Sequence, residues 1–413
     1  MSILFYLKID SKRFFEKKLS YNEVMQKLLL QNLNIHTQTR SISDAAVYIE
    51  NGTIREICHM KKASQFKDCK TVNFPSNYHI IPGMIDMHIH GCHGVDVMDA
   101  TPEAIEHISR QLPQQGTTAF LATTMTQTEA NIAQAIQNIA KHRRLQFSDG
   151  AEVVGIHLEG PFISPKKVGA HKKDLVRHPD IQLFNEWQTH AEGAIRCVTV
   201  APEVSNALEF ICHLKERGVI ASIGHTNATY QQTLAGIRAG ATHATHLFNA
   251  MSGLHHRSPG AVLAILEQQD ILAELIADGL HVSAEMLAFA LQCKSVSHCC
   301  LVTDSMRAAC MGEGEYELSG QKVIVKEGVP RLADGTIAGS VLTMIEAFQN
   351  IMRLTSCSIH DAISLTSYNP ARQLGLLNRK GSLAIGKEAD LVILDNDYNV
   401  VSTYCCGKLA YQM

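Results

Sequence analysis

The sequence of 413 residues contains no run of about 18 consecutive apolar residues, which is the length that a helix needs to cross a bilayer. We therefore expect no membrane-spanning segment. The apolar run that begins at Ile3 is short and is soon followed by charged residues, starting with Lys8. It does not have the form of a secretory signal peptide.

The sequence also lacks an excess of basic residues. Its formal net charge is -3, and no cluster of Lys and Arg indicates a face that could neutralise nucleic-acid phosphates. Neither a P-loop nor a G-x-G-x-x-G motif opening a helix is present, so a nucleotide cradle is not expected. These absences favour a small-molecule partner and argue against nucleic acid.

The 12 cysteines have no zinc-finger or redox spacing. No C-x-x-C occurs, and the adjacent pairs Cys299-Cys300 and Cys405-Cys406 do not fit such a framework. In a chain without a secretory signal, this usage is typical of reduced thiols that serve as small core residues. We therefore expect a cytoplasmic protein.

The two ends of the chain predict a small β-domain. Residues 1–26 are lysine-rich, and we interpret them as an N-terminal extension to which no role can be assigned. Short alternating apolar runs follow, and the turn Asn51-Gly52 between two of them indicates a β-hairpin. Residues 389–395 form another predicted strand. We expect residues 27–79 and 377–413 to form one small β-sandwich domain.

Between these ends, residues 80–376 alternate between apolar strands and amphipathic helices. Helical patterns cover, for example, Glu103 to Leu112 and Thr128 to His142. Eight strands alternating with helices predict an α/β fold, a (β/α)8 TIM-like barrel, whose active site lies at the carboxyl ends of the strands. The predicted strands are 80–89, 117–125, 152–159, 195–201, 219–225, 243–248, 272–278 and 299–304.

His88 and His90 close the first of these strands. Residues i and i+2 of a strand point to the same side, so both imidazoles face one way at its carboxyl end. Two hydrogen-bonded core histidines are the simpler explanation when the pair is considered alone. A metal site becomes the better explanation because other strand ends carry further candidate ligands.

Four more strand ends supply imidazole or carboxylate groups. Glu159, His225 and Asp304 each close a predicted strand, and His246 lies near the end of another. These groups suit divalent ions such as zinc, iron or manganese. Six such residues at one end of a barrel are hard to explain as packing, because charged groups are rarely buried unpaired. We expect one or two divalent ions per subunit, most simply zinc or iron. His157 and His243 precede ligand candidates, and we interpret them as core residues or as supports behind the ligands.

The chain resembles the N-acetylglucosamine-6-phosphate deacetylases of the amidohydrolase superfamily from about residue 27 to its end. The resemblance rests on a combination of motifs: His-Leu-Glu-Gly-Pro-Phe (157–162), Gly-His-Thr (224–226), His-Leu-Phe-Asn-Ala-Met (246–251), Ala-Asp-Gly-Leu-His (277–281), Thr-Asp-Ser-Met (303–306) and Ile-Ala-Gly-Ser (337–340). It implies metal-dependent hydrolysis of the acetamide of N-acetylglucosamine 6-phosphate to glucosamine 6-phosphate and acetate, in amino-sugar catabolism.

The resemblance also implies a role for each site residue. Glu159, His225 and His246 match the principal metal ligands, and His88 and His90 match the ligands of a second ion. Asp304 matches the general base and acid. The residues that match substrate contacts are His171, Asn249, the backbone of Ala250, Arg257 and His281. A guanidinium at Arg257, in a turn-rich loop, could bind phosphate with two hydrogen bonds. In the family, phosphate contacts can be completed across a dimer interface, so a homodimer is expected.

Three alternatives stay open at this point. The substrate could be another N-acetyl-hexosamine 6-phosphate, such as the galactosamine epimer, because epimer choice depends on a single hydroxyl contact. A dihydroorotase or hydantoinase activity would typically use a carboxylated lysine, whereas the third strand here ends in Glu159. A catalytically silent scaffold with this fold would be expected to have lost ligands or the acid–base Asp304.

Overall fold

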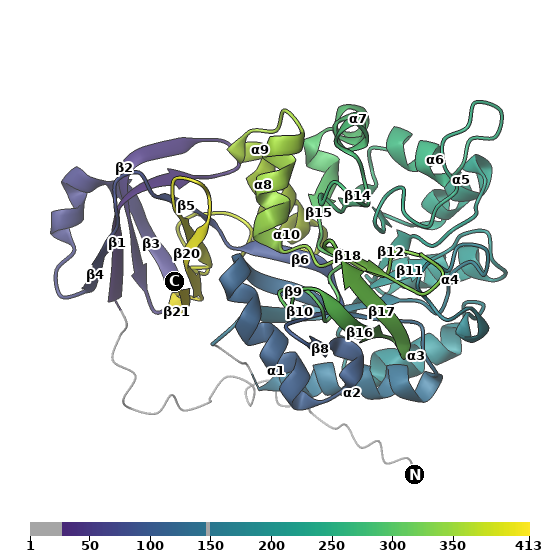
Figure 1. Ribbon diagram of the computed structural model, residues 1–413. Helices are drawn as coiled ribbons and strands as arrows, with labels where there is room; N and C mark the ends of the chain where they lie inside the picture. The colour runs from purple at the N-terminus through teal and green to yellow at the C-terminus, as the bar shows by residue number, and fades with distance from the viewer. Residues whose placement is uncertain (1–26, 146–148) are drawn as a thin grey trace, which may run out of the picture.

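The computed structural model describes residues 27–145 and 149–413, which form a barrel with a small β-sheet beside it (Figure 1). The predicted extension 1–26 lies outside the described residues. No helix in the described residues is long and apolar enough to cross a membrane.

Eight parallel strands form the barrel, in the order β15-β14-β13-β12-β11-β10-β9-β6. Each of these strands lies within one of the eight predicted strand segments. They are β6 (Met84–Ile89), β9 (Thr117–Thr124), β10 (Glu152–Glu159), β11 (Ile195–Val200), β12 (Ile220–Ile223), β13 (His243–Ala244), β14 (Leu272–Leu275) and β15 (Cys299–Leu301).

The first and last strands meet just beyond the end of β15. The backbone N–H of Asp304 donates to the carbonyl of His88 at 2.8 Å, and that of His90 donates to the carbonyl of Ser305 at 2.9 Å. Deeper in the barrel, the buried carboxylate of Asp86 accepts the hydroxyl of Thr303 at 2.6 Å and its N–H at 3.3 Å. Side-chain and backbone bonds therefore bring together the two strands that carry the proposed second ligand group and the proposed base.

A helix follows each barrel strand and covers the outside of the barrel. Polar side chains cap several of these helices: the hydroxyl of Thr101 accepts from Ala104 N at the start of α1, and Thr343 and Glu346 form a capping box at the start of α8. The helices are α1 (Pro102–Gln111), α2 (Glu129–Arg144), α3 (Ile181–His190), α4 (Ala207–Glu216), α5 (Tyr230–Ala239), α6 (Ala261–Glu267), α7 (Ala284–Lys294), α8 (Met344–Leu354), α9 (Ile359–Ile363) and α10 (Asn369–Gln373).

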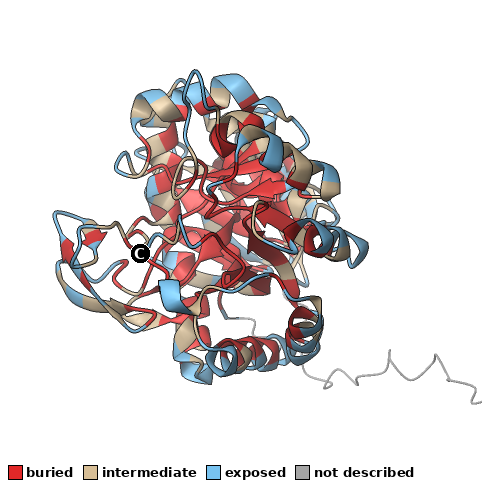
Figure 2. Cartoon of the chain, turned by 90° about the vertical axis from the view of Figure 1, so that its right-hand side faces the viewer, coloured by how far each residue is buried: buried red, intermediate tan, exposed pale blue. Residues whose placement is uncertain are grey.

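Burial follows this layering. The barrel strands are buried almost throughout, and the helices around them bury their inner faces and expose their outer ones (Figure 2). Trp187, the single tryptophan of the sequence, is buried on α3 against Phe162, with 5.9 Å between ring centroids. Fluorescence of this residue therefore reports on the packing of helices against the barrel.

Both chain ends contribute to the small sheet, as the sequence predicts. Its strand order is β21-β20-β19-β5-β1-β2-β3, with β4 also paired to β1. Leucines of β1 share one apolar cluster with Leu391 and Tyr404, so strands from both chain ends enclose a common core. The strands are β1 (Lys27–His36), β2 (Ser41–Glu50), β3 (Thr53–His59), β4 (Lys70–Asn73), β5 (His79–Pro82), β19 (Leu391–Leu394), β20 (Val400–Cys405) and β21 (Lys408–Gln412).

The predicted hairpin is confirmed. Asn51 and Gly52 join β2 to β3 with φ of 51° and 73°, as a tight hairpin turn requires at both central positions.

The predicted strand 80–89 is wrong as a single strand. It divides at Gly83: β5 belongs to the small sheet and pairs with β1 and β19, whereas β6 belongs to the barrel. The apolar run continues across the junction because both strands are buried, so hydrophobicity alone gives no boundary. The domain limits at residues 79 and 377 remain a prediction.

Two further sheets, one of two strands and one of three, lie at the carboxyl end of the barrel. They were not predicted from the sequence. β7 (Gly91–Cys92) pairs with β8 (Val95–Asp96) just after the first barrel strand. A three-stranded antiparallel sheet of β16 (Gly314–Leu318), β17 (Gln321–Lys326) and β18 (Val329–Arg331) follows the eighth strand and lies beside the barrel opening (Figure 1).

Candidate active site

The side chains of Glu159, His225 and His246 meet at the carboxyl end of the barrel. Oε1 of Glu159 lies 3.1 Å from Nε2 of His225 and 3.1 Å from Nε2 of His246, and the two Nε2 atoms are 3.0 Å apart. All three residues are almost fully buried. One carboxylate oxygen and two ring nitrogens therefore point at a single position.

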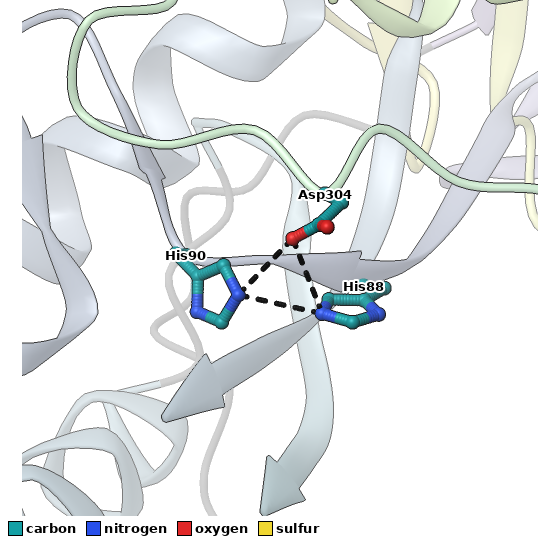
Figure 3. A group of neighbouring side chains, drawn as sticks. All are labelled: His88, His90 and Asp304. Carbon is teal, nitrogen blue, oxygen red and sulfur yellow. Dashed lines mark hydrogen bonds and ion pairs between the residues drawn. The ribbon is translucent and has the colours of Figure 1, made fainter. Parts of the chain in front are cut away.

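A second group lies next to the first and comes from the two strands that meet at the barrel closure. Nε2 of His88 and Nε2 of His90 are 3.3 Å apart, and Oδ1 of Asp304 lies 3.4 Å and 3.2 Å from them (Figure 3). The strand pattern predicted the shared direction of the two imidazoles, and the structure confirms it.

Glu159 connects the two groups through its two oxygens. Oε1 faces His225 and His246, whereas Oε2 lies 3.4 Å from Nε2 of His88 and 3.2 Å from Nε2 of His90. Without a bound metal ion, burial alone would raise the pKa of Glu159, but the charge of His88 and hydrogen bonds from the surrounding histidines outweigh it and hold the pKa well below its usual range. Glu159 is therefore ionised and can contact both positions at once.

The ring tautomers fit a metal centre. Nδ1 of His225 lies 2.9 Å from the carbonyl of Lys167, and Nδ1 of His90 lies 3.3 Å from the carbonyl of Thr123. A carbonyl only accepts, so these Nδ1 atoms carry the proton, and in the neutral ring that metal binding requires each Nε2 presents a lone pair to the centre. Lone pairs facing one another at about 3 Å would repel without a cation between them. This donor set of imidazole and carboxylate therefore suits a divalent ion at each group.

Three of these residues lie just beyond their strands with the backbone in the left-handed region. The φ angles of His225, His246 and Asp304 are 44°, 30° and 48°, in a region that only a few per cent of non-glycine residues adopt. This explains why β12, β13 and β15 end earlier than predicted: the chain turns as soon as the side chain must point into the barrel mouth. The predicted strands that end at 225, 248 and 304 are therefore too long.

A cavity of about 530 Å³ opens above the two groups. Among the predicted substrate-binding residues, it is lined by His171, Asn249, Ala250 and His281. Arg257 does not line it; this residue is exposed on the loop before α6, where its Nη1 lies 2.6 Å from Nε2 of His256. The structure thus brings together all the predicted ligands, Asp304 and four of the five predicted substrate contacts.

The sequence profile of the amidohydrolase family matches residues 79–410. A curated N-acetylglucosamine-6-phosphate deacetylase from Bacillus subtilis (strain 168) is 43% identical over 388 residues, covering 94% of this chain and 98% of that relative. This chain belongs to the amidohydrolase family. The resemblance that the motifs indicate is confirmed, and the chain is a hydrolase of a metal-dependent family.

Two further relatives of this amidohydrolase bear on its specificity. A curated N-acetylgalactosamine-6-phosphate deacetylase from Escherichia coli O157:H7 is 39% identical over 331 residues, covering 80% of this chain and 87% of that relative. A solved structure of N-acetyl-D-glucosamine-6-phosphate deacetylase from Mycobacterium smegmatis, in complex with N-acetyl-D-glucosamine-6-phosphate, has a TM-score of 0.87 at 32% identity. That comparison covers 93% of this chain and 99% of the other.

Several residues of the amidohydrolase site escaped the sequence analysis. Lys166 and Lys167, from the loop after β10, and Asp334 and Thr336, from the segment after β18, line the cavity. They lie in loops with no periodic pattern, so the sequence holds no signal for their place. Glu274 lies directly behind His88, inside the barrel. A lone carboxylate in the apolar strand Leu272–Leu275 is a signal that could have identified it, because such a group must meet a partner.

Proposed function

We propose that this amidohydrolase removes the acetyl group of N-acetylglucosamine 6-phosphate, giving glucosamine 6-phosphate and acetate in amino-sugar catabolism. The observation that carries the proposal is the joint placement of two ligand groups, linked by Glu159, beneath a cavity that Asp304 of the second group also lines. The deacetylase relatives with the same overall fold support the choice of substrate.

Glu159, His225 and His246 would hold one divalent ion, and His88 and His90, with Glu159, would hold a second. Such an ion lowers the pKa of a bound water towards about 7 and polarises a carbonyl oxygen. Asp304 supplies the proton transfers, which are to take a proton from the attacking water and to deliver it to the departing amine. Without a bound metal ion, burial alone would raise the pKa of Asp304, but His88 and His90 outweigh burial and lower it to about 2, so the side chain is a carboxylate at neutral pH, the form that can accept a proton.

His171 is suited to donate a hydrogen bond to the acetyl oxygen. Its Nδ1 accepts the backbone N–H of Thr126 at 3.2 Å, so Nε2 carries the proton. That Nε2 lies 3.5 Å from Oε2 of Glu159, at the edge of the ligand groups. A donor in this position stabilises the charge that develops on the oxygen during attack.

The other end of the cavity is suited to the sugar and its phosphate. Nδ1 of His281 is held by Asp278 at 2.6 Å, which leaves Nε2 for the substrate. Asn249 and the backbone of Ala250 would bind the phosphate. Arg257 does not line the cavity of its own subunit. We propose that it binds the phosphate in the cavity of the other subunit, across a dimer interface. We therefore propose a homodimer, and we propose the cytoplasm as its location because all 12 cysteines are free.

The substrate assignment is tested by acetate release from purified, metal-loaded protein. We expect faster release from N-acetylglucosamine 6-phosphate than from unphosphorylated N-acetylglucosamine, because the phosphate contributes binding. The galactosamine epimer is the competing substrate, and the relative from Escherichia coli O157:H7 is the reason to include it. Equal or absent turnover of the phosphorylated and unphosphorylated glucosamine compounds would refute the assignment, and faster turnover of the epimer would reassign it.

We propose two ions per subunit, of zinc or iron, since imidazole and carboxylate accept both. His88→Asn removes a ligand of the second group only. Metal analysis should show one ion fewer per subunit in this variant than in the wild type. His157→Asn is the matched control, because His157 is equally buried and its ring lies 4.6 Å from that of His88, yet its Nε2 bonds Thr199. If His88→Asn keeps the full metal content, His88 is not a ligand.

A further inference from the structure

Glu274 is a fully buried carboxylate inside the barrel. Its neighbours in β14 are Leu272, Ala273 and Leu275, and all four residues of this strand are buried. An unpaired charge in such a place costs several kcal/mol, so the carboxylate must be held by specific partners. The proposed mechanism does not use it.

Three nitrogen atoms surround this carboxylate. Oε2 lies 3.0 Å from Nδ1 of His88 and accepts the backbone N–H of His246 at 3.0 Å. Oε1 lies 2.9 Å from Nε2 of His243. An ionised carboxylate only accepts hydrogen bonds, so His88 and His243 are the donors at these contacts. One buried group thus supports a side chain of the second ligand group and the backbone of a residue in the first.

The contact to His88 differs from the contacts behind the other ligand histidines. Nδ1 of His90 and Nδ1 of His225 face neutral backbone carbonyls, and Nδ1 of His246 has no hydrogen-bond partner among the described residues. A negative partner on Nδ1 fixes the tautomer and raises the electron density on Nε2 more than a neutral carbonyl does. Among the ligand histidines, His88 is therefore the one whose affinity for a metal ion depends most on its hydrogen-bond partner.

We propose that Glu274 is a positioning residue that fixes His88 with its Nε2 lone pair toward the second ligand group, and that its negative charge strengthens this nitrogen as a ligand and thereby sets the metal affinity of that group. The inference rests on the metal centre of the proposed function and deepens it. His243 completes the arrangement by donating to the other carboxylate oxygen, which explains a buried histidine that contacts no cavity. Affinity for the second ion should then depend on Glu274 far more than affinity for the first.

Glu274→Gln is the sharpest variant. The amide oxygen can still accept from His88 and from the N–H of His246, and the amide nitrogen can face His243 if that ring changes its tautomer. The shape and the hydrogen bonds are kept, and only the negative charge is lost. Titration of the metal-free protein with Zn²⁺ or Co²⁺ should show affinity for the second ion lowered by about 10- to 100-fold, the usual effect of losing such a partner. The first ion should bind within about threefold of its wild-type affinity.

Asp86→Asn is the matched control. Asp86 is equally buried, lies two residues before His88 on β6, and accepts from Thr303 and from the backbone N–H of His88. It touches no ligand imidazole. We expect this variant to bind both ions with affinities close to wild type. An equal loss in both variants would show a general effect of the polar interior and would overturn the proposal, as would unchanged affinity in Glu274→Gln.

A measurement on the wild-type protein covers the case in which Glu274→Gln does not fold. Histidine side-chain ¹H–¹⁵N spectra of the metal-loaded protein, with His88 assigned by its loss in His88→Asn, should show a proton on Nδ1 and none on Nε2. The opposite tautomer overturns the proposal, as does a wild type that binds only one ion. Two-ion binding without acetate release would instead refute the proposed function and leave the role of Glu274 standing.

Discussion

Asp304 lies where it could both bind a metal ion and transfer a proton. Its Oδ1 lies within 3.4 Å of Nε2 of both His88 and His90, and the residue also lines the cavity. A carboxylate in this position could be a metal ligand, a proton carrier or both. Its backbone is left-handed, with φ of 48°, and its side chain points into the mouth of the barrel.

Asp304→Asn separates these roles, because the amide keeps the shape and one oxygen but cannot accept a proton at neutral pH. We expect kcat to fall by about 10²–10⁴-fold, with KM changed only a few-fold and metal content retained. Steady-state kinetics together with metal analysis of the same sample is the measurement. A near-wild-type kcat in an Asp304→Asn protein with full metal content would show that Asp304 does not transfer the proton. A loss of metal in this variant would show that Asp304 is a ligand.

The sequence predicted those site residues that end strands. His88 and His90 follow from the two-residue period of a strand, and Glu159, His225 and Asp304 follow from apolar runs that stop at a polar residue. His246 follows from its place near the end of a predicted strand. Glu274 could not be placed this way, since it lies within its strand and its partner His88 is 186 residues away in the chain. Long-range pairing of this kind leaves no local pattern.

At the scale of elements, the sequence predicted the strands better than their boundaries. β13 has only two residues, His243 and Ala244, although its apolar run continues to Phe248. Hydrophobicity persists there because the turn itself is buried, and left-handed residues such as His246 are not visible in composition. The division of 80–89 into β5 and β6 was missed for a similar reason.

Gly83, at that division, is the position where the small sheet joins the barrel. A Cβ atom there would lie 2.1 Å from Oγ1 and 2.5 Å from Cγ2 of Thr118, a buried β-branched residue of β9 that has little room to move. We expect Gly83→Ala to lower the free energy of unfolding by about 1–3 kcal/mol, the usual cost of overpacking. Urea unfolding followed by Trp187 fluorescence would measure it.

Gly253→Ala serves as the control for this substitution, because a Cβ there meets nothing within 4 Å. It should change the free energy of unfolding by less than about 0.5 kcal/mol. A Gly83→Ala protein as stable as this control would mean that the junction between the two sheets is loose.

At the scale of the whole molecule, a chain of hydrogen bonds ties the small sheet to helix α9. Nε2 of His36 lies 2.9 Å from Nδ1 of His79, and Nδ1 of His36 lies 2.7 Å from Oγ of Ser41. Ser41 lies 3.3 Å from Nε2 of His360 on α9, whose Nδ1 donates to the carbonyl of Thr37 at 2.6 Å. Each ring needs only one proton for this arrangement, so the junction is built for neutral histidines.

This junction should weaken in acid. Burial, together with the neighbouring His79 and His360, lowers the pKa of His36 from 6.5 to about 4. Because the unfolded chain then binds a proton that the folded one does not, stability is fully present above pH 6.5 and is lost as the pH falls towards 4. Urea unfolding at several pH values in this window should show a smaller loss for His36→Gln than for wild type. Parallel losses would exclude His36 as the source of acid sensitivity.

In the proposed mechanism, one metal centre built on Glu159 performs the hydrolysis. The most direct test removes metal with a chelator and then measures acetate release from N-acetylglucosamine 6-phosphate as ions are returned. We predict no turnover by the metal-free protein and a rise that ends at two ions per subunit, with Glu159→Gln inactive at every metal concentration. Full turnover by protein shown to be free of metal would rule out a metal centre as the source of the hydrolysis.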